Sequence, residues 1–402
     1  MIAENIDINS KNQRARKYAN RILKLKNYGW ETIPITIKKY QQNKTYVQNE
    51  IKKEYKNNSI KSEMIDSLIK KLNFSGLFPD LYFYHIPSMI MKSKKIINNQ
   101  NINAIHTSCF PFTFHVVGLI LKEKYDIPWI AEFRDCWANH PKFNKNKKIL
   151  HEYLEKKTVE KADKIIINYG IQMELDYFYK KYPNVSKKKF EEVYPPWDGF
   201  DFLRYKNVKE KKFENEFNII HAGNFYGTNN LIDFLEGLKL FIEKNKINQN
   251  QFSVNFFGKK RKEYFETVKT YNLEKYVSFF DRISYDELLS YFKSSNAALF
   301  IPRKFPGDEL NIPGKIIDYI GAKLPIIGIV KDSWRSAQFL RNNNLGFISD
   351  PYNPEEICFN LEKIFYFDNK VEKLLANDNV YSGISTEIFV KKFSEYLNEI
   401  SN

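Results

Sequence analysis

The chain has 402 residues, 43% of them hydrophobic and 16% aromatic, a composition that supports a packed globular protein and excludes a disordered one. Its length predicts two domains or somewhat more, and its three cysteines, Cys109, Cys136 and Cys358, are too scattered for a disulfide framework or a structural zinc site. The formal net charge of +15 has two interpretations. It either serves a function, by attracting an anionic membrane or nucleic acid, or it reflects a composition rich in Lys and Asn.

The apolar segments follow a regular order along the chain. Short runs of the kind that form buried strands alternate with helical stretches such as residues 112–125, 149–162, 231–245 and 354–365. Strands that alternate with helices form parallel sheets covered on both faces, so the sequence predicts an α/β protein. The predicted strands lie at residues 30–36, 102–108, 128–133, 164–170 and 190–196 in the first half, and at 217–223, 252–258, 276–281, 296–302, 325–330 and 345–349 in the second.

Charged residues follow the strand predicted at residues 128–133. In the segment IPWIAEFRDCWANHP, apolar residues lead into Glu132, Arg134, Asp135 and Trp137, which places the charges at the carboxyl end of a parallel strand. Ligands of open α/β sheets bind at that edge. Arg134 and Asp135 are therefore predicted catalytic residues that orient an acceptor hydroxyl or stabilise developing charge. The alternative is an ion pair between them that braces the cleft between the domains.

Two turns in the second half carry small or basic residues after predicted strands. Gly223 and Asn224 follow the apolar segment FNIIHA, where small residues and amides suit a diphosphate; a β-turn glycine is the alternative. Lys259, Lys260 and Arg261 follow the next strand, where a cation can neutralise a pyrophosphate, although such runs are also common on solvated surfaces. Both turns are thus predicted to bind a diphosphate.

The segment IPRKFPGDELNIPGKIIDYIGAKLPIIGIV places acids and a helix start between two apolar strands. Pro313 suits a helix start, and the free amides of Gly314 and Lys315, together with the helix dipole, favour an anion. Asp318 lies about one turn into the helix, where it can accept hydrogen bonds from a ribose diol, and Glu309 in the preceding loop can reach the sugar side of the same anion. The alternative is an ordinary helix start with a solvated Asp318.

The second-half residues resemble the nucleotide-sugar site of glycosyltransferases with the GT-B fold, especially the retaining family 4. The resemblance gives Glu309 a role near the transferred sugar and Asp318 a role on the ribose, with Asp318 in place of the usual Glu. It also matches Arg282 and Ile283 to a turn whose backbone contacts the base, although Ser284 there also suits a helix N-cap.

The first-half segment resembles a second signature of the same family. Arg134, Asp135 and Trp137 match the Asp-Phe-Arg-Asp-Pro-Trp pattern of a bacterial branch assigned to surface-polysaccharide synthesis, while Glu132 and Cys136 replace its Asp and Pro. The two signatures occur in the order that the family has, and the resemblance extends over about residues 102–365.

The resemblance implies two Rossmann-like domains that face each other across a cleft. It predicts an acceptor-side domain at 1–197, a nucleotide-sugar domain at 198–384, and an amphipathic terminal helix at 385–402 that crosses back to the first domain. GT-B first domains begin with a buried strand, whereas this chain opens with polar residues and enters a helix at 14–30. We therefore expect the first strand to be missing and the sheet to begin at residues 30–36.

The implied reaction moves a sugar from a nucleoside-diphosphate sugar to a hydroxyl of a glycan or lipid-linked acceptor in cell-surface polysaccharide synthesis. Retention of configuration is implied by the resemblance alone. No cofactor or metal is expected, because the sequence has no Asp-x-Asp motif and because Lys315 and helix amides can stabilise the leaving diphosphate. A non-catalytic subunit or scaffold and a nucleotide-sugar epimerase are the alternatives.

The sequence also predicts where the protein acts. It has neither the apolar core of a signal peptide nor an apolar run of membrane-spanning length, which predicts a cytoplasmic protein, at the inner face of the cell membrane if it contacts anionic lipid. Its basic residues are spread along the chain and its aromatic residues fit a core, so nucleic acid is disfavoured as a partner.

Overall fold

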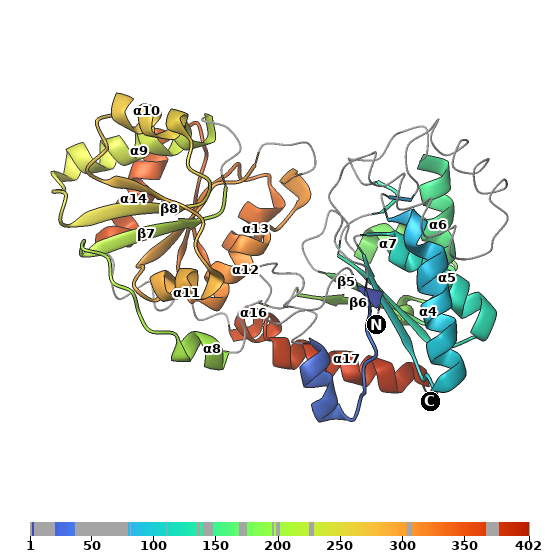
Figure 1. Cartoon of the computed structure of the whole chain (residues 1–402). Helices are drawn as coiled ribbons and strands as arrows, with labels where there is room; N and C mark the ends of the chain where they lie inside the picture. The colour runs from blue at the N-terminus through green and yellow to red at the C-terminus, as the bar shows by residue number, and fades with distance from the viewer. Residues whose placement is uncertain are drawn as a thin grey trace. The chain divides into compact units, whose positions relative to one another are not determined.

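The structure is a computed structural model of the chain, and it describes residues 2–3, 21–36, 79–80, 82–109, 111–134, 137–139, 148–168, 175–194, 197, 202–224, 229–303, 308–366 and 378–401. The chain divides into two compact units, each built around a parallel sheet (Figure 1). The first unit comprises Met1–Asn168, Met173–Val193 and Val390–Asn402, and the second comprises Tyr169–Gln172 and Tyr194–Phe389.

The first unit contains a six-stranded parallel sheet in the order β2-β1-β3-β4-β5-β6. Every residue of its central strands β3, β4 and β5 is buried, because helices cover both faces of the sheet. Helix α5 packs against β3 and β4 and lies between α4 and α6. The elements of this unit are β1 (Ile2–Ala3), η1 (Lys26–Tyr28), β2 (Ile35–Thr36), η2 (Phe83–His85), α4 (Ile86–Asn99), β3 (Ile105–Cys109), α5 (Thr113–Tyr125), β4 (Trp129–Phe133), α6 (Lys148–Lys161), β5 (Lys164–Asn168), α7 (Leu175–Lys181), η4 (Lys187–Lys189) and β6 (Phe190–Val193).

The expectation that the first strand is missing is wrong. Strand β1 pairs in parallel with both β2 and β3, with Ile2 opposite Ile35 on one side and Thr107 on the other. The strand escaped detection because it has only two residues, Ile2 and Ala3, followed by polar sequence, whereas a recognisable strand pattern needs a run of roughly four or more. The first sheet therefore has its innermost strand, and both sheets have six strands among the described residues.

The second unit has the strand order β12-β11-β10-β7-β8-β9, all parallel. The first three strands of this unit, β7 to β9, extend in one direction across the sheet, and the last three, β10 to β12, extend in the other. This is the doubly wound order, and the direction reverses between β7 and β10. Every strand predicted for this half overlaps an observed one. The elements are α8 (Phe202–Asn207), β7 (Phe217–Ala222), α9 (Asn229–Asn245), β8 (Phe252–Phe257), α10 (Lys262–Thr270), β9 (Val277–Phe280), α11 (Tyr285–Lys293), β10 (Ala297–Phe300), η5 (Asp308–Leu310), α12 (Gly314–Gly321), β11 (Ile326–Ile329), α13 (Arg335–Asn342), β12 (Gly346–Ser349), α14 (Pro354–Tyr366) and α16 (Asp378–Gly383).

The second sheet separates two hydrophobic cores. Alternate residues of a strand point to opposite faces, and Ile219 and Ile220 of β7 accordingly belong to different cores. The first core joins the sheet to α9 and α14, and the second joins it to α11, α12 and α13. Because α12 is anchored by the second core, its amino end has a fixed position beside the carboxyl ends of β7 and β10.

The last helix, α17 (Thr386–Ser401), belongs to both units. Its first residues group with the second unit, where the Thr386 hydroxyl donates to the carbonyl oxygen of Trp197. From Val390 onward it groups with the first unit, where Phe393 contacts the ring of His106 and Glu399 pairs with the ammonium of Lys164 at 3.0 Å. The helix is therefore an integral part of the first unit's packing.

Candidate functional site

The second sheet has its topological switch point between β7 and β10, which are neighbours that lead to opposite halves of the sheet. Ligands of open α/β sheets bind outside the carboxyl ends of the strands at such a point. Strand β7 ends at Ala222 and β10 at Phe300, so Gly223 and Asn224 lie at this edge, as do residues 301–303. This edge of the sheet is the candidate donor site.

Lys315 joins α12 to the end of β7 at this edge. Its Nζ lies 3.4 Å from Nε2 of His221 and 3.5 Å from the position that a Cβ would take on Gly223. Gly223 has φ of +120°, a conformation that only glycine adopts readily, and this brings bare backbone against the ammonium. Gly314, the first residue of α12, is exposed, and nothing lies within 4 Å of its own Cβ position. The structure thus places Gly223 and Lys315 together, beside an open helix start.

His221 holds Lys315 as a neutral acceptor. Its Nδ1 lies 2.9 Å from the carbonyl oxygen of Leu299, and because a carbonyl only accepts, Nδ1 carries the proton and Nε2 faces Lys315 with a lone pair. Burial and then the charge of Lys315 lower the pKa of His221 well below its usual range. The same carbonyl also accepts from the hydroxyl of Tyr319, which in turn accepts from the amide of Ala222. These bonds fix both β7 and α12 around the ammonium.

The described part of the chain supplies no carboxylate to match the charge of Lys315. Burial lowers the pKa of its ammonium to about 8, and the positive charge of Arg303 acts in the same direction. Arg303 itself pairs with Asp308 at 2.8 Å, whereas Lys315 has no carboxylate partner among the described residues. An anion at this edge would supply the opposite charge that is missing, and it would raise the pKa of Lys315 again.

The turns after β7 and β8 pack directly on each other. The side-chain oxygen of Asn224 accepts from the amide of Lys259 at 2.9 Å, and the amide of Gly223 donates to the carbonyl of Phe257 at 2.8 Å. A Cβ on Gly258 would overlap the carbonyl oxygen of Gly223, so a glycine is needed for this approach. The structure therefore brings together Asn224 and Lys259, two residues that the sequence selected separately.

Asp318 lies one turn further along α12 and is positioned by α11. The hydroxyl of Tyr285 donates to its Oδ1 at 2.9 Å. Tyr285 is the first residue of α11, whose predicted N-cap is confirmed because the Ser284 hydroxyl accepts from the amide of Glu287. The turn with Arg282 and Ile283 directly precedes this cap, so the predicted base-binding turn and the predicted ribose acid are connected through Tyr285.

Three predicted residues lie outside the group around Lys315. Arg261 is the N-cap residue of α10 and has an exposed side chain, and Arg282 is exposed on the turn before α11. Glu309 is exposed in the short helix η5. Their assigned roles in donor binding and catalysis stay predictions, since the geometry does not bring them to the ammonium.

In the first unit, Arg134 connects the carboxyl ends of β3 and β4 through hydrogen bonds. It follows β4, and both its backbone amide and its Nε donate to the carbonyl oxygen of Cys109 at the end of β3, at 3.2 and 3.0 Å. Asp135 and Cys136 lie outside the described residues, so the catalytic role of Asp135 and its alternative pairing with Arg134 both stay predictions.

Glu132 has a different place from the one that the sequence suggested. It is a fully buried residue within β4 rather than a charge at the edge, and Nη1 of Arg21 donates to both of its oxygens at 3.0 and 2.9 Å. Nε2 of His106 lies 3.1 Å from the same carboxylate. Burial opposes ionisation, but Arg21 and then His106 outweigh it and hold the pKa of Glu132 well below its usual range. Glu132 is thus a structural ion-pair residue.

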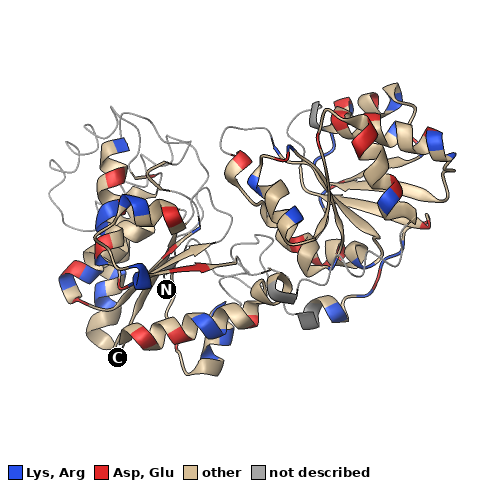
Figure 2. Ribbon diagram, turned by 180° about the vertical axis from the view of Figure 1, so that it is seen from behind, with Lys and Arg blue, Asp and Glu red and all other residues tan. Residues whose placement is uncertain are grey.

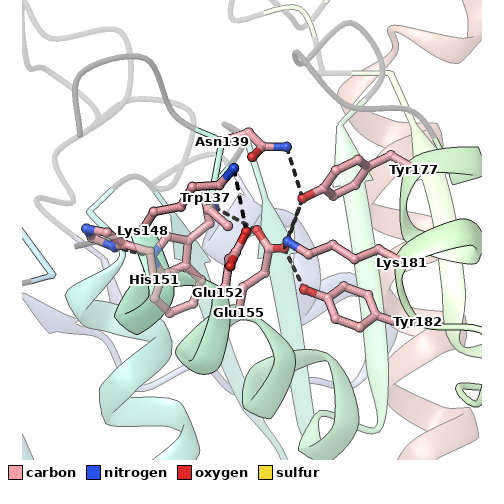
Figure 3. A network of polar contacts seen from close by, with 10 residues as sticks. Trp137, Asn139, Lys148, His151, Glu152, Glu155, Tyr177, Lys181 and Tyr182 are labelled. Carbon is pink, nitrogen blue, oxygen red and sulfur yellow. Dashed lines mark hydrogen bonds and ion pairs between the residues drawn. The ribbon is translucent and has the colours of Figure 1, made fainter. Parts of the chain in front are cut away.

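A second buried carboxylate anchors the segment that follows Arg134 (Figure 3). Glu155 of α6 accepts hydrogen bonds from the amide of Ala138 at 2.8 Å and from the hydroxyl of Tyr182 at 2.6 Å, and it pairs with Lys181 at 2.7 Å. Trp137 is also fully buried, and its Nε1 donates to Nδ1 of His151. The signature Trp137 is therefore a packing residue that, with Glu155, fixes the chain just beyond Asp135.

Sequence analysis did not select His221, Tyr285 or Glu155. His221 could have been predicted, because a histidine at the end of the apolar strand β7, two residues before Gly223, is a typical position for a polar residue of a binding site. Glu155 had none: the buried face of α6 consists of His151, Glu155, Thr158 and Val159, and this mixture does not resemble a core-facing stripe.

Positive and negative residues are interspersed along the helices of both units (Figure 2). Several of the lysines form pairs with acids one turn away, for example Lys156 with Glu160 and Lys262 with Glu266. Among the described residues, no helix has the length and apolar character needed to cross a membrane.

No protein-family model matches the chain, and no curated protein matches its sequence. Solved structures do match. Sucrose-phosphate synthase from Thermosynechococcus elongatus is 15% identical, with a TM-score of 0.51 over 79% of this chain and 78% of that one. A protein provisionally named UDP-N-acetylglucosamine 2-epimerase from Listeria monocytogenes is 10% identical, with a TM-score of 0.54 over 95% and 93%. A UDP-forming α,α-trehalose-phosphate synthase from Burkholderia xenovorans is 10% identical, with a TM-score of 0.52 over 82% and 81%.

At these identities the likeness establishes the fold and nothing finer. That fold is GT-B, with two Rossmann-like parallel-sheet units, as the sequence predicted.

Proposed function

We propose that the protein is a glycosyltransferase that uses a nucleoside-diphosphate sugar as donor. The observation that carries the proposal is the half-buried ammonium of Lys315, which lies beside the bare backbone of Gly223 at the switch point and has no carboxylate partner among the described residues. A diphosphate is the ligand that this combination of unmatched charge, open helix start and close backbone best fits.

In the proposed complex, each part of the donor meets a different element. The diphosphate lies against Lys315 and the first amides of α12, and the ribose diol donates to Asp318, which Tyr285 holds in place. The turn at Arg282 and Ile283 contacts the base. Lys259 and Arg261 contribute further positive charge, and Glu309 lies on the sugar side. A protein provisionally named UDP-N-acetylglucosamine 2-epimerase and a synthase named as UDP-forming share the fold, which is consistent with this donor class.

The proposed reaction breaks the bond between the anomeric carbon and the diphosphate oxygen and forms a bond from that carbon to an acceptor oxygen. Negative charge develops on the leaving diphosphate, where Lys315 and the helix amides stabilise it without rearrangement. In the proposal, Arg134 of the first unit orients the acceptor hydroxyl, and the carboxylate of Asp135 accepts its proton as the new bond forms. No metal is assigned a step, because the positive groups of α12 take that role in the proposal.

The acceptor is proposed to be a glycan or lipid-linked sugar of cell-surface polysaccharide synthesis, with retention of configuration and a cytoplasmic location at the membrane face. The acceptor class rests on the sequence signature around Arg134 and Trp137, and retention rests on the family resemblance alone. The location rests on the apolar pattern and the basic composition of the sequence. The argument for a non-catalytic scaffold is weaker than the sequence suggested, because β1 completes the first sheet.

The first experiment is a thermal-shift panel with the nucleoside diphosphates and their sugars. A ligand that binds the folded state raises the melting temperature by mass action. We expect one base to give a selective shift, Lys315→Ala and Asp318→Ala to abolish it, and Lys262→Ala to retain it, since Lys262 is 88% exposed. A shift that survives Lys315→Ala would place the donor elsewhere, and the absence of any shift would contradict donor binding.

A second measurement separates the transferase from the epimerase. Incubation with the selected donor and no acceptor should leave the sugar configuration unchanged, whereas conversion of the donor alone would establish an epimerase. With acceptor, Asp135→Ala should lower turnover more than donor affinity.

A further inference from the structure

The first unit contains a cavity of about 470 Å³ that the proposed donor site does not use. It lies where the chain enters β2 and β3, so residues 30–33, Ile35 and residues 101–105 form much of its wall, and residues of α4, α5 and α17 also line it. Both strands begin here, which puts the cavity at the amino-terminal edge of the sheet. Arg134 follows the opposite, carboxyl edge, and the cavity is therefore separate from the catalytic residues proposed for this unit.

The floor of the cavity is apolar and buried. Its side chains come from the helix before η1, from the first residues of β2 and β3, and from α5 and α17, and each is less than a tenth exposed. A floor of this kind favours the apolar part of a ligand in proportion to the area removed from water. The floor residues are Leu25, Ile35, Ile105, Leu121, Phe393 and Leu397.

The rim of the cavity is polar and made largely of amides. Gln100, Asn101, Asn103 and Asn398 line it and are exposed. The indole Nε1 of Trp30 donates to Oδ1 of Asn398 at 3.2 Å, which holds the rim of α17 against the segment before β2. Amide side chains offer both donors and acceptors, and this pairing suits hydroxyl groups.

The charge of the lining restricts the ligand further. None of the described residues that line the cavity is Lys or Arg, although the chain has 63 of them. The lining also includes His106, but burial lowers the pKa of its imidazole and favours the neutral form, so an anionic group would enter a partly apolar site without a counter-charge from the described lining. The acid Glu31 is exposed on the rim, where solvent screens its charge.

We propose that this cavity is a binding site for an uncharged amphiphile, a molecule with an apolar body and a hydroxyl-bearing head, as in an alkyl glycoside. The apolar body occupies the isoleucine, leucine and phenylalanine floor, and the hydroxyls bond to the amide rim. The volume lies within the range of small-molecule pockets, which is about 300–1,000 Å³. The proposal does not depend on the donor site of the second unit.

Three probes test the class of ligand on the wild-type chain by titration calorimetry. Octyl β-glucoside, kept below its micelle concentration, carries both parts, methyl β-glucoside carries the head alone, and octanoate carries a tail with an anionic head. We expect saturable binding of octyl β-glucoside, and affinities at least about tenfold weaker for the other two, because one loses the buried methylenes and the other brings an unpaired charge. Equal or tighter binding of octanoate, or no saturable binding of octyl β-glucoside, would overturn the proposal.

A matched pair of variants on α4 locates the site. Ile97 lines the cavity, and Met91 on the same helix is 44% exposed and does not. Ile97→Trp should fill the cavity and weaken octyl β-glucoside binding at least about tenfold, while Met91→Trp should leave it within about twofold. Unchanged binding in a folded Ile97→Trp protein would place the ligand elsewhere and refute the assignment. If Ile97→Trp does not fold, the wild-type probe series still decides the ligand class, and Ala104→Phe fills the same cavity from the segment before β3.

Discussion

The two units treat buried charge in opposite ways. In the first unit, the fully buried Glu132 and Glu155 each have a cation within 3 Å, and further donors complete their hydrogen bonds. In the second unit, Lys315 faces the neutral ring of His221, and the nearby charge of Arg303 repels it. The charges of the first arrangement are paired within the protein, whereas Lys315 in the second has no carboxylate partner among the described residues.

We propose that this difference separates structural charges from functional ones. A charge that the fold has already neutralised contributes to stability and has little left to offer a ligand. A charge that the fold leaves unmatched costs stability, and it is retained where a ligand restores the balance. Charged variants in the first unit should therefore affect unfolding, and variants around Lys315 should affect binding.

The largest expected effect is the loss of the Glu132 carboxylate. Glu132→Gln leaves the guanidinium of Arg21 buried with a neutral partner, and breaking a buried pair from one side typically costs about 3–5 kcal/mol. Denaturant unfolding should show this loss. The control is Glu152→Gln, because Glu152 forms an exposed pair with Lys148 at 3.8 Å and its removal should change little. Equal effects of the two variants would remove the contrast between the units.

The fold was largely predictable from the sequence, and the reason lies in local patterns. The apolar runs within β4, β5 and β7–β12 are long enough to indicate buried strands, and the segment from Pro313 to Asp318 marks a helix start directly. Strand β1 has too few residues for a pattern.

The contacts of the sites were less predictable, because they join distant segments. Nothing local shows that Arg21 pairs with Glu132, 111 residues away, or that Tyr285 bonds to Asp318, 33 residues away. The local pattern correctly predicted that Lys315 and Asp318 lie in the first turns of a helix. It wrongly placed Glu132 at the edge of the sheet, because the distant Arg21 pairs with that carboxylate inside the protein.

The second prediction concerns the unmatched charge itself. Lys315→Met removes a charge-assisted hydrogen bond to the diphosphate, worth roughly 1.5–3 kcal/mol, so donor affinity should fall about 10- to 100-fold. The stability of the ligand-free protein should not fall, since the ammonium has no carboxylate partner among the described residues. Calorimetric titration and denaturant unfolding measure the two quantities. A large loss of stability with unchanged affinity would make Lys315 a structural residue like Glu132.

Tyr182→Phe tests whether the Glu155 network is structural. The Tyr182 hydroxyl donates to the buried Glu155 carboxylate at 2.6 Å, and losing a hydrogen bond to a charged group costs roughly 1.5–3 kcal/mol. The matched control is Tyr271→Phe in the second unit, whose hydroxyl donates to Glu236 at an exposed position. Unfolding of both variants should show the larger loss for Tyr182→Phe, with donor affinity unchanged in each. A fall in donor affinity for Tyr182→Phe would assign the network a role in binding.

The pH dependence should differ between binding and stability. In the ligand-free fold the pKa of Lys315 is lowered to about 8 from its ordinary value of 10.5, so between these values the unfolded chain binds more protons than the fold does. Stability should therefore rise with pH over this interval, relative to Lys315→Met. Donor affinity should fall above about pH 8, by up to about tenfold per pH unit, because binding needs the ammonium. Identical pH profiles for the wild-type and Lys315→Met proteins would contradict both expectations.

The smallest expected effect distinguishes the two halves of the donor site. Tyr285→Phe removes the hydrogen bond that holds Asp318 but leaves the carboxylate in place. The loss should equal the free energy of one neutral hydrogen bond, about 1 kcal/mol, which lowers donor affinity about fivefold. The effect should be seen with a nucleoside diphosphate and not with inorganic pyrophosphate, which has no ribose for Asp318 to accept from. Lys315→Met should weaken both ligands. If Tyr285→Phe weakened pyrophosphate as well, α11 would act on the helix start as a whole rather than on Asp318, and the ribose would have to be bound by another group.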